Sequence, residues 1–193
     1  MVWAMSTAKR LHYEYAEYLS SLEMSDLKLE YCDGVIYAMA GGTRAHAQLS
    51  AAVIVSLHRV LPKNCRLSTS DMKVRVEASG LSTFPDVSVI CGEPTTSSID
   101  ANAITNPTVL VEVTSKGTED YDRGDKLSHY KQLPSLKVVL FVSHRTRSIT
   151  RVERTATGWD EREFRAGEVV ALESPAVSFT VDELYEGLEL DPA

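Results

Sequence analysis

Hydrophobic residues recur along this chain with two different periods, and the pattern predicts a mixed α/β protein. Over residues 43–62 they return every three or four positions, which predicts a long amphipathic helix with Thr43 as its N-cap. Other hydrophobic runs are short, rich in β-branched residues and bounded by Gly or Pro, as is typical of strands. Two of these runs, residues 86–90 and 108–114, follow prolines and are largely apolar, so we expect them to be buried central strands.

The remaining segments follow the same two patterns. Asp33-Gly34 stands between two strand-like runs, and this dipeptide is a strong signal for a β-hairpin. The order strand, helix, strand over residues 108–143 predicts a right-handed crossover within one sheet. Residues 92–106 are mostly polar and predict a loop. The other expected elements are helices over residues 13–22, 118–133 and 181–188, hairpins over 28–39 and 148–164, and strands over 66–76, either one bent or two short, and 137–143.

The length and composition indicate an ordinary globular protein. A chain of 193 residues favours one compact domain over residues 1–193, and 44% hydrophobic with 24% charged residues excludes disordered and collagen-like chains. No apolar stretch approaches the roughly 18 residues that a membrane span needs. The first residues lack the apolar core of a secretory signal, so we expect a cytoplasmic protein with no membrane partner. Cys32, Cys65 and Cys91 lie far apart, and we expect packing residues rather than disulfide partners or metal ligands.

The charge is distributed unevenly along the chain. The net charge is −7, but residues 166–193 hold seven acids and no Lys or Arg, whereas residues 1–165 hold 20 charges of each sign. An acidic chain argues against a nucleic-acid partner, since phosphate binding needs Lys and Arg, but a neutral body weakens that argument. A group of four arginines could face phosphate or line a solvent-exposed sheet edge, and we favour the sheet edge: Arg145, Arg147, Arg151 and Arg154.

Two carboxylates stand where the strand pattern predicts burial. Alternation over residues 109–114 places Glu112 on the face opposite the three valines, so its side chain should be mostly buried. A buried carboxylate has to bind a cation, pair with a base or be protonated. Asp86 begins the preceding strand, and the two carboxylates together would suit a hard cation. The alternative is an exposed Asp at a sheet edge and a Glu at a frayed strand end.

The predicted helix over residues 118–133 adds a base near these carboxylates. Asp122, Lys126 and Tyr130 recur at spacings of four and therefore share one helix face. Taken alone, Asp122 and Lys126 would be a solvent-exposed helical ion pair. Because this helix follows the Glu112 strand through a short loop, Lys126 could instead point at the carboxylates.

Taken together, these residues resemble the Uma-type restriction endonuclease family of the PD-(D/E)xK nuclease superfamily. The resemblance extends upstream to an acidic hairpin and a histidine at the start of the long helix, and it covers residues 12–145 in the order of the family. The residues that carry it are 30–34 (Glu-Tyr-Cys-Asp-Gly), Met39, His46, Pro85-Asp86-Val87, 110–115 (Leu-Val-Glu-Val-Thr-Ser), Thr118, Asp122, Lys126 and Tyr130.

The resemblance implies a restriction-endonuclease-like α/β core with a mixed sheet, an N-terminal hairpin and a C-terminal β-hairpin extension. It implies that Asp86 and Glu112 bind Mg²⁺, for which Mn²⁺ could substitute, and that Lys126 is catalytic. Glu30 would be a further carboxylate near the metal. His46 would hydrogen-bond a metal ligand or a phosphate, or else would cap or pack against the helix. The family also implies a homodimer.

The chain departs from the superfamily pattern at one position. The superfamily usually carries its Lys two residues after the Glu, and Thr114 occupies that position here. In the Uma-type branch the Lys resembles one that has moved to the following helix, a position that Lys126 satisfies. The geometry expected is that Asp86, Glu112 and Lys126 converge in one cleft with Glu30 and His46 on its wall.

The expected function is that of a Mg²⁺-dependent endonuclease acting on DNA. Two alternatives remain open at this point. One is a nuclease-fold binding or assembly module that does not cleave. The other is a metal-dependent hydrolase of a small phosphoester, which would tolerate an acidic surface better than DNA binding does.

Overall fold

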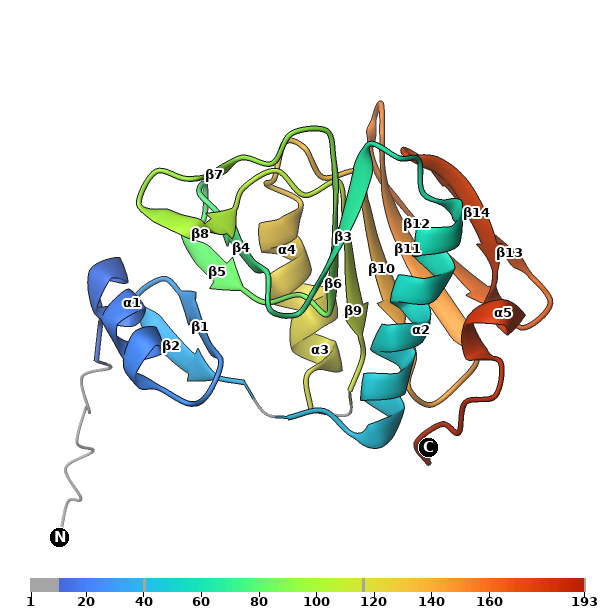
Figure 1. Ribbon diagram of the computed structural model, residues 1–193, viewed down its shortest axis with the longest axis horizontal. Helices are drawn as coiled ribbons and strands as arrows, with labels where there is room; N and C mark the ends of the chain where they lie inside the picture. The colour runs from blue at the N-terminus through green and yellow to red at the C-terminus, as the bar shows by residue number, and fades with distance from the viewer. Residues whose placement is uncertain (1–10, 40, 116, 193) are drawn as a thin grey trace, which may run out of the picture.

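The computed structural model describes residues 11–39, 41–115 and 117–192, which form two six-stranded sheets and a separate two-stranded hairpin (Figure 1). The first sheet has the strand order β2 (Val35–Ala38), β1 (Leu29–Cys32), β5 (Leu81–Thr83), β4 (Lys73–Val76), β8 (Asp100–Ile104) and β7 (Thr96–Ser97). The second has the order β12 (Gly158–Arg165), β11 (Ser148–Thr155), β10 (Val138–Val142), β9 (Val109–Val113), β6 (Val87–Cys91) and β3 (Cys65–Thr69). The hairpin pairs β13 (Val169–Glu173) with β14 (Ala176–Thr180), and α5 (Val181–Tyr185) follows it.

Strand β9 lies in the middle of the second sheet and is buried on both faces, as the sequence predicts. It runs parallel to β10 and antiparallel to β6. Its three valines pack into one hydrophobic core, whereas Leu110 packs into a second core on the opposite face. Glu112 shares the face of Leu110, because residues two apart on a strand point the same way. The alternation that predicted a buried Glu112 is therefore present, and its side chain is 4% exposed.

Helix α2 (Arg44–Val60) covers the valine face of this sheet (Figure 1). The Thr43 hydroxyl accepts a hydrogen bond from the backbone amide of His46 and so caps the helix, as predicted. Leu49, Val53 and Leu57 recur at helical spacing and are buried in the same core as the β9 valines. Because the cap fixes where the helix begins, it also fixes the position of its first turn beside the second sheet.

The helical segment between β9 and β10 covers the opposite face. It consists of α3 (Glu119–Tyr121), a π-helical turn η1 (Asp122–Lys126) and α4 (Leu127–Tyr130). Leu127 and Tyr130 pack with Leu110 in the second core. The parallel pairing of β9 and β10 confirms the predicted strand-helix-strand crossover. The π-helical turn was not predicted, and such turns are rare and occur frequently at functional sites.

The N-terminal hairpin forms where Asp33-Gly34 predicted it. Asp33 and Gly34 have φ angles of 45° and 78°, the left-handed conformation that a tight two-residue hairpin turn requires. Helix α1 (Tyr15–Met24) packs Tyr18 against Leu29 and Tyr31 of β1. Strand β1 then pairs with β5, so the hairpin is part of the first sheet and carries Glu30 into the protein interior.

Parts of this architecture differ from the sequence-based expectation. The segment 92–106 is not a loop, because it contains β7 and β8, and β8 pairs with β4. The polar sequence of β8 did not predict a strand, because β8 lacks the apolar pattern of a buried strand. Its Asp100 is buried but forms an ion pair of 2.7 Å with Lys73. Residues 66–76 form two strands that belong to different sheets. No helix in the described ranges is long and apolar enough to cross a membrane.

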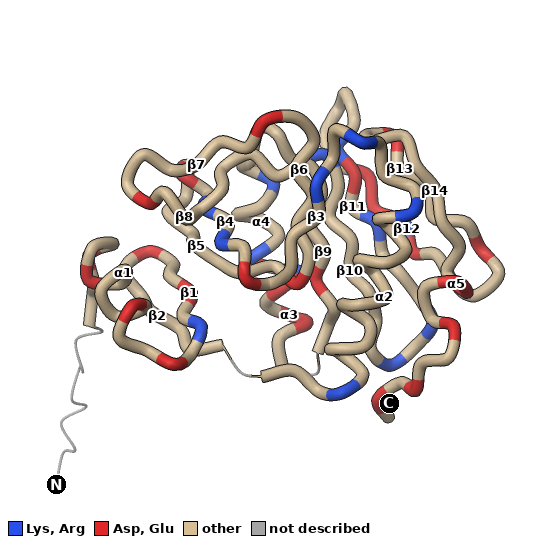
Figure 2. The backbone as a smooth tube through the Cα atoms, viewed as in Figure 1, with Lys and Arg blue, Asp and Glu red and all other residues tan. Residues whose placement is uncertain are grey.

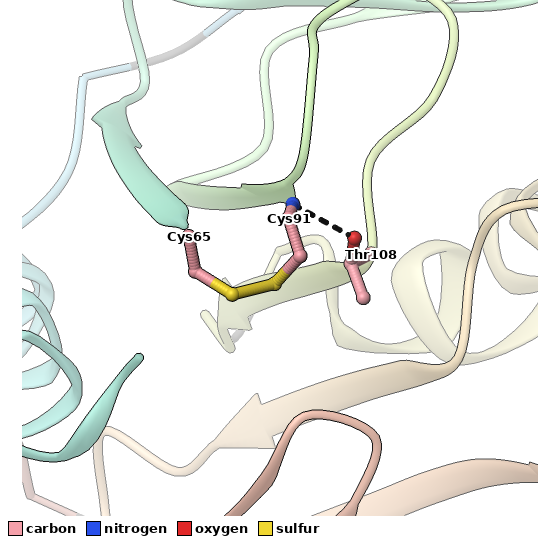
Figure 3. The surroundings of a disulfide bond; sticks show 3 residues. All are labelled: Cys65, Cys91 and Thr108. Carbon is pink, nitrogen blue, oxygen red and sulfur yellow. Dashed lines mark hydrogen bonds between the residues drawn. A yellow bond between two sulfur atoms is a disulfide. The ribbon is translucent and has the colours of Figure 1, made fainter. Parts of the chain in front are cut away.

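The expectation for the cysteines is wrong for two of them. Cys65 and Cys91 form a disulfide between β3 and β6, where they lie directly opposite one another (Figure 3). The backbone amide of Cys91 also donates a hydrogen bond to the Thr108 hydroxyl at 3.1 Å. The two cysteines are 26 positions apart, and spacing alone cannot reveal a pair that strand register brings together. Cys32 is a free thiol.

Reduction of this disulfide is expected to lower the free energy of unfolding by about 3 to 4 kcal/mol, because it frees a loop of this length in the unfolded chain. Urea unfolding with and without a phosphine reductant measures the difference. The double variant Cys65→Ala/Cys91→Ala should unfold at the same urea concentration in both buffers. A wild-type midpoint that does not respond to the reductant would contradict the expectation.

Candidate functional site

A buried lysine lies among three carboxylates between the two sheets. The Lys126 Nζ atom is 3.0 Å from Glu112 Oε1 and 3.5 Å from both Glu30 Oε1 and Asp122 Oδ1. All four residues are less than 10% exposed. The lysine therefore points at the carboxylates, as the position of its helix predicted, and is not part of a solvent-exposed ion pair.

Glu112 is held from the helix on the face opposite α2. The Tyr130 hydroxyl donates a hydrogen bond of 2.5 Å to Glu112 Oε1, the oxygen that also contacts Lys126. Tyr130 is fully buried and lies four positions after Lys126, about one helical turn further along. One helix face thus presents two donors to a single carboxylate oxygen.

Glu30 reaches the same lysine from the first sheet. Its carboxylate accepts a hydrogen bond from the Thr83 hydroxyl on β5 as well as contacting Lys126. The family resemblance implied a carboxylate beside a metal. The structure places Glu30 against the lysine that contacts Glu112, where it helps to hold the ammonium group in position.

Asp86 and His46 lie on the other side of Glu112. The Asp86 carboxylate accepts a hydrogen bond of 2.7 Å from the backbone amide of Val113, the residue after Glu112, and its Oδ2 is 3.2 Å from His46 Nε2. The hydrogen bond to Asp86 raises the pKa of His46, although burial opposes this. The structure therefore brings together all five residues that the sequence singled out.

The site carries an excess of negative charge. Burial raises the pKa of Glu112 to about 8, and repulsion from Asp86 and Asp122 contributes, although Lys126 opposes the shift. Burial likewise raises the pKa of Asp122. Burial alone would lower the pKa of Lys126, but its carboxylate neighbours outweigh this and hold its pKa well above the usual value. The lysine is accordingly charged, and the carboxylates outnumber the bases that could neutralise them.

The donor atoms fit a hard divalent cation. Within the described residues, the hydrogen bonds and ion pairs of Asp86 and Glu112 use only Asp86 Oδ2 and Glu112 Oε1, which leaves one oxygen of each carboxylate free. No three His, Cys, Asp or Glu side chains of the described chain are arranged as a complete metal cluster. Mg²⁺ does not need one, since it keeps several waters and commonly binds through one or two carboxylates. A cation there would also offset the repulsion that raises the pKa of Glu112.

Sequence reasoning missed one contact of the site and left the placement of one residue open. It did not identify Thr83, because the strand β5 has only three residues and gives little periodic signal. It considered Asp122 as a possible surface residue, but this side chain is 5% exposed and contacts Lys126. Thr114, at the usual lysine position of the superfamily, is buried and lies 3.4 Å from His144. Lys126 supplies from the helix the ammonium group that Thr114 lacks.

The four arginines that could have faced phosphate are partly engaged elsewhere. The expected solvent-exposed sheet edge is wrong for Arg151, because β11 lies between β10 and β12, and Arg151 pairs there with Glu153 and Asp160. Arg154 donates hydrogen bonds to the backbone carbonyl groups of Lys131, Leu133 and Leu136. These two side chains are thus committed to contacts within the protein.

Replacing Tyr130 with Phe removes one donor to Glu112 and should lower the free energy of unfolding by about 1 to 3 kcal/mol. The loss should grow as the pH rises from 5 to 9, because the Tyr130 hydrogen bond favours the charged form of Glu112 and lowers its pKa. Urea unfolding at several pH values measures this dependence. Tyr185→Phe is the matched control, since the Tyr185 hydroxyl donates only to the carbonyl groups of Ser143 and Ser148. Its loss should be independent of pH, and parallel pH profiles for the two variants would contradict the prediction.

Comparison with known proteins places this chain in a family. Residues 14–184 match the family described as "Uma2: Putative restriction endonuclease". Two relatives from Synechocystis sp. are called "Uncharacterized protein slr1290", 36% identical over 174 residues (89% of this chain and 90% of the relative), and "Uncharacterized protein sll1609", 31% identical over 132 residues (66% and 72%).

A solved structure shares the fold. The crystal structure of a protein from Anabaena variabilis, described as "a putative nuclease belonging to DUF820", superposes with a TM-score of 0.65 at 13% identity and covers 83% of this chain and 91% of that one. At this level of identity the likeness shows the fold alone, which is mixed α/β as expected. Because the family match extends over most of the chain and one relative is 36% identical along 89% of it, this chain belongs to the Uma2 family of restriction-endonuclease-like proteins.

Proposed function

We propose that this protein is a divalent-cation-dependent endonuclease that hydrolyses phosphodiester bonds of DNA. The observation that carries the proposal is the buried Lys126 beside Glu112, with Asp86, just before β6, hydrogen-bonded to the amide of the next residue, Val113. Membership in a family described as a restriction endonuclease supports the same reaction class. Burial of three carboxylates around one lysine is costly for stability, and a functional site accounts for that cost.

Asp86 and Glu112 would hold the cation, Mg²⁺ or Mn²⁺, through the oxygens that no protein group occupies. A bound cation would neutralise charge on the scissile phosphate and increase the acidity of a nearby water. His46 and the Val113 amide orient the Asp86 carboxylate, and Tyr130 orients Glu112. The residues of this chain thus fix the direction of both carboxylates before any ligand arrives.

Lys126 would stabilise negative charge that develops on the phosphate during cleavage. Its ammonium group is charged and is held by Glu30, Glu112 and Asp122, so little reorganisation is needed during the reaction. Contacts with three carboxylates from different elements fix its direction more firmly than a single ion pair would.

Cleavage assays on supercoiled plasmid and single-stranded DNA, with Mg²⁺, Mn²⁺ or EDTA, test the proposal. Nicking or linearisation that requires the cation and is lost in Asp86→Asn would support it. Salt-dependent binding of DNA without cleavage would favour a binding module. For such a module, the logarithm of the affinity should fall with the logarithm of the salt concentration, with a slope of about 0.9 for each phosphate contact. Hydrolysis of bis(p-nitrophenyl) phosphate but not of DNA would favour a small-phosphoester hydrolase. Sedimentation of the same preparation tests the homodimer that the family resemblance implies.

Binding of the cation should also stabilise the folded protein. At a Mg²⁺ concentration ten times the dissociation constant, stability rises by about 1.4 kcal/mol, which corresponds to roughly 3 to 6 °C in melting temperature for a chain of this size. Differential scanning fluorimetry with 0 to 20 mM Mg²⁺ or Mn²⁺ measures the shift. Asp86→Asn should abolish it, whereas Asp160→Asn, a change at an exposed Asp on β12, should leave it intact. A wild-type melting temperature that neither cation changes would contradict the proposed metal site.

A further inference from the structure

The end of the acidic C-terminal segment lies beside the candidate site. Residues 188–192, which we call the C-terminal strap, follow α5 and return to the start of α2. Leu188 and Leu190 pack against the core beneath α2. The backbone amide of Asp191 donates a hydrogen bond of 2.9 Å to the carbonyl oxygen of His144. In Figure 2 the acidic positions of the chain end lie next to the basic position at the start of α2.

Two acidic side chains of the strap bind the first residues of α2. The Thr43 hydroxyl donates a hydrogen bond of 2.6 Å to Asp191 Oδ2, and Arg44 pairs with Glu189 at 2.5 Å. The same first turn carries His46, which contacts Asp86 of the candidate site. The strap carboxylates therefore lie within about one helical turn of the site.

The surface beneath the strap has the chemistry of a phosphate contact. The first turn of α2 contains no acidic residue of its own, and the unpaired amides of a helix start attract anions. Arg44 adds a positive charge, and Arg145 lies beside His144 under the strap, with its Nε atom 3.2 Å from His144 Nε2. Glu189 and Asp191 occupy this surface with carboxylates, which are the anionic groups that a phosphodiester would replace.

The strap contacts are weak enough to be displaced. In the Arg44–Glu189 pair the side chains are 74% and 79% exposed, and exposed ion pairs contribute little stability. Within the described residues, the strap has few anchors apart from this pair: two half-buried leucines, the Thr43 hydrogen bond, and backbone hydrogen bonds to Tyr185 and His144. A polyanion that offers several phosphates could compete with it for Thr43 and Arg44.

We propose that the C-terminal strap is an autoinhibitory element, which occupies with Glu189 and Asp191 the surface that contacts the DNA backbone next to the candidate site. This inference rests on the proposed function. Entry of the substrate displaces the two carboxylates and frees Arg44 and Thr43 for phosphate. The negative charge of the strap weakens the binding of polyanions that cannot replace its carboxylates at Thr43 and Arg44.

The test compares two double variants that remove the same charge. Glu189→Gln/Asp191→Asn removes both strap charges but keeps their shape and an acceptor for Thr43. Glu173→Gln/Glu186→Gln removes two charges of the same acidic segment, from side chains that form no ion pair within the described residues. Binding of a fluorescent DNA duplex is measured by anisotropy in EDTA over a range of salt concentrations, and melting temperatures confirm that the variants are folded.

The strap variant should bind the duplex about five-fold more tightly than wild type, the limit set by release of one exposed ion pair. Its slope of log affinity against log salt should be steeper by about 0.9, because in wild type phosphate only replaces Glu189 at Arg44, whereas in the variant the Arg44 contact with phosphate releases a counterion. The control variant should change affinity less than two-fold, with an unchanged slope. Adding Arg44→Ala to the strap variant should cancel its gain, whereas Arg44→Ala alone should have little effect on wild type.

The outcomes separate the strap from the proposed function. Equal gains in both double variants would mean that only the overall charge matters, which would overturn the strap while leaving the nuclease proposal standing. If the strap variant keeps its gain in DNA affinity after Arg44→Ala is added, the strap proposal is also overturned. Absence of DNA binding in every variant at low salt, together with absence of cleavage in Mg²⁺ and Mn²⁺, would overturn the proposed function and the strap with it.

Discussion

Replacing Lys126 with Met should lower the rate of DNA cleavage by about 10² to 10³ fold, equivalent to roughly 2.7 to 4 kcal/mol of transition-state stabilisation. The reason is that Lys126 is the one lysine in contact with Glu112 within the described residues, and its ammonium group is preorganised by three carboxylates. Single-turnover rates at saturating Mg²⁺, corrected for the folded fraction, measure the effect. Equal rates for the variant and wild type would leave Lys126 with a structural role only.

The same change should destabilise the protein by about 3 to 5 kcal/mol, since it leaves Glu30, Glu112 and Asp122 buried without their cation. The loss should shrink as the pH falls, because burial raises the pKa of both Glu112 and Asp122 in the folded protein, so protonation removes their charge first. Urea unfolding at pH 5 and pH 8 measures both the loss and its pH dependence. Lys63→Met, at an exposed position after α2, should change stability by less than about 0.5 kcal/mol.

A second lysine position allows the loss of charge to be separated from the loss of geometry. Thr114 shares a face of the strand with Glu112 and lies two residues beyond it. In Lys126→Met/Thr114→Lys the new ammonium group would approach Glu112 from the strand instead of from the helix. Recovery of stability without recovery of cleavage would show that the position of Lys126, and not only its charge, is required for the reaction.

Replacing Glu112 with Gln should abolish cleavage and the response to divalent cations, yet should stabilise the cation-free protein at pH 8, where the charged form of Glu112 is disfavoured by burial. The pKa of Glu112 is raised to about 8 in the folded protein, from an ordinary value of 4.5. Between these two values the folded chain holds a proton that the unfolded chain has released. The contribution of Glu112 to stability therefore falls as the pH rises through this window.

Urea unfolding from pH 5 to pH 9 tests this sign. Wild type should lose stability with rising pH, and the part due to Glu112 should be absent from Glu112→Gln. Glu153→Gln is the matched control, because Glu153 is as buried as Glu112. Glu153, however, pairs with Arg151 and accepts a hydrogen bond from the backbone amide of Glu173. That variant should be less stable than wild type throughout. A Glu112→Gln variant that is also less stable at pH 8 would show that the Lys126 and Tyr130 contacts outweigh the burial of the charge.

The sequence was informative where local pattern and burial coincide. Strand β9 is covered on both faces, so any polar residue within it is conspicuous, and Glu112 could be recognised as buried before the structure was known. Asp33-Gly34 specified its hairpin because few residues adopt positive φ angles easily. The burial of Lys126 could not be recognised in the same way. Its helical spacing from Asp122 fitted an exposed ion pair as well as a buried one. The family resemblance was needed to favour the buried arrangement.

Contacts between distant strands could not be predicted in this way. The pairing of Cys65 with Cys91 depends on the register of β3 and β6, which no local pattern specifies. Strand β8 is held by a parallel pairing with β4 and by the buried ion pair of Asp100 with Lys73. A polar segment with a tertiary partner looks like a loop when the partner is unknown. Asp122 was ambiguous for the same reason, since its burial depends on neighbours contributed by other elements.

The site is built across both sheets, and this has a consequence for the synthesis of the protein. Glu30 reaches Thr83 over 53 positions of sequence, and Asp86 reaches the amide of Val113 over 27. The helix that carries Lys126 packs Leu127 and Tyr130 in one core with Val139 and Phe141 of β10, the strand beside β9. A chain still on the ribosome would therefore hold its carboxylates without their lysine, since contacts over such separations form late in folding. A truncated translation product or a degradation fragment without β10 would therefore lack the assembled candidate site.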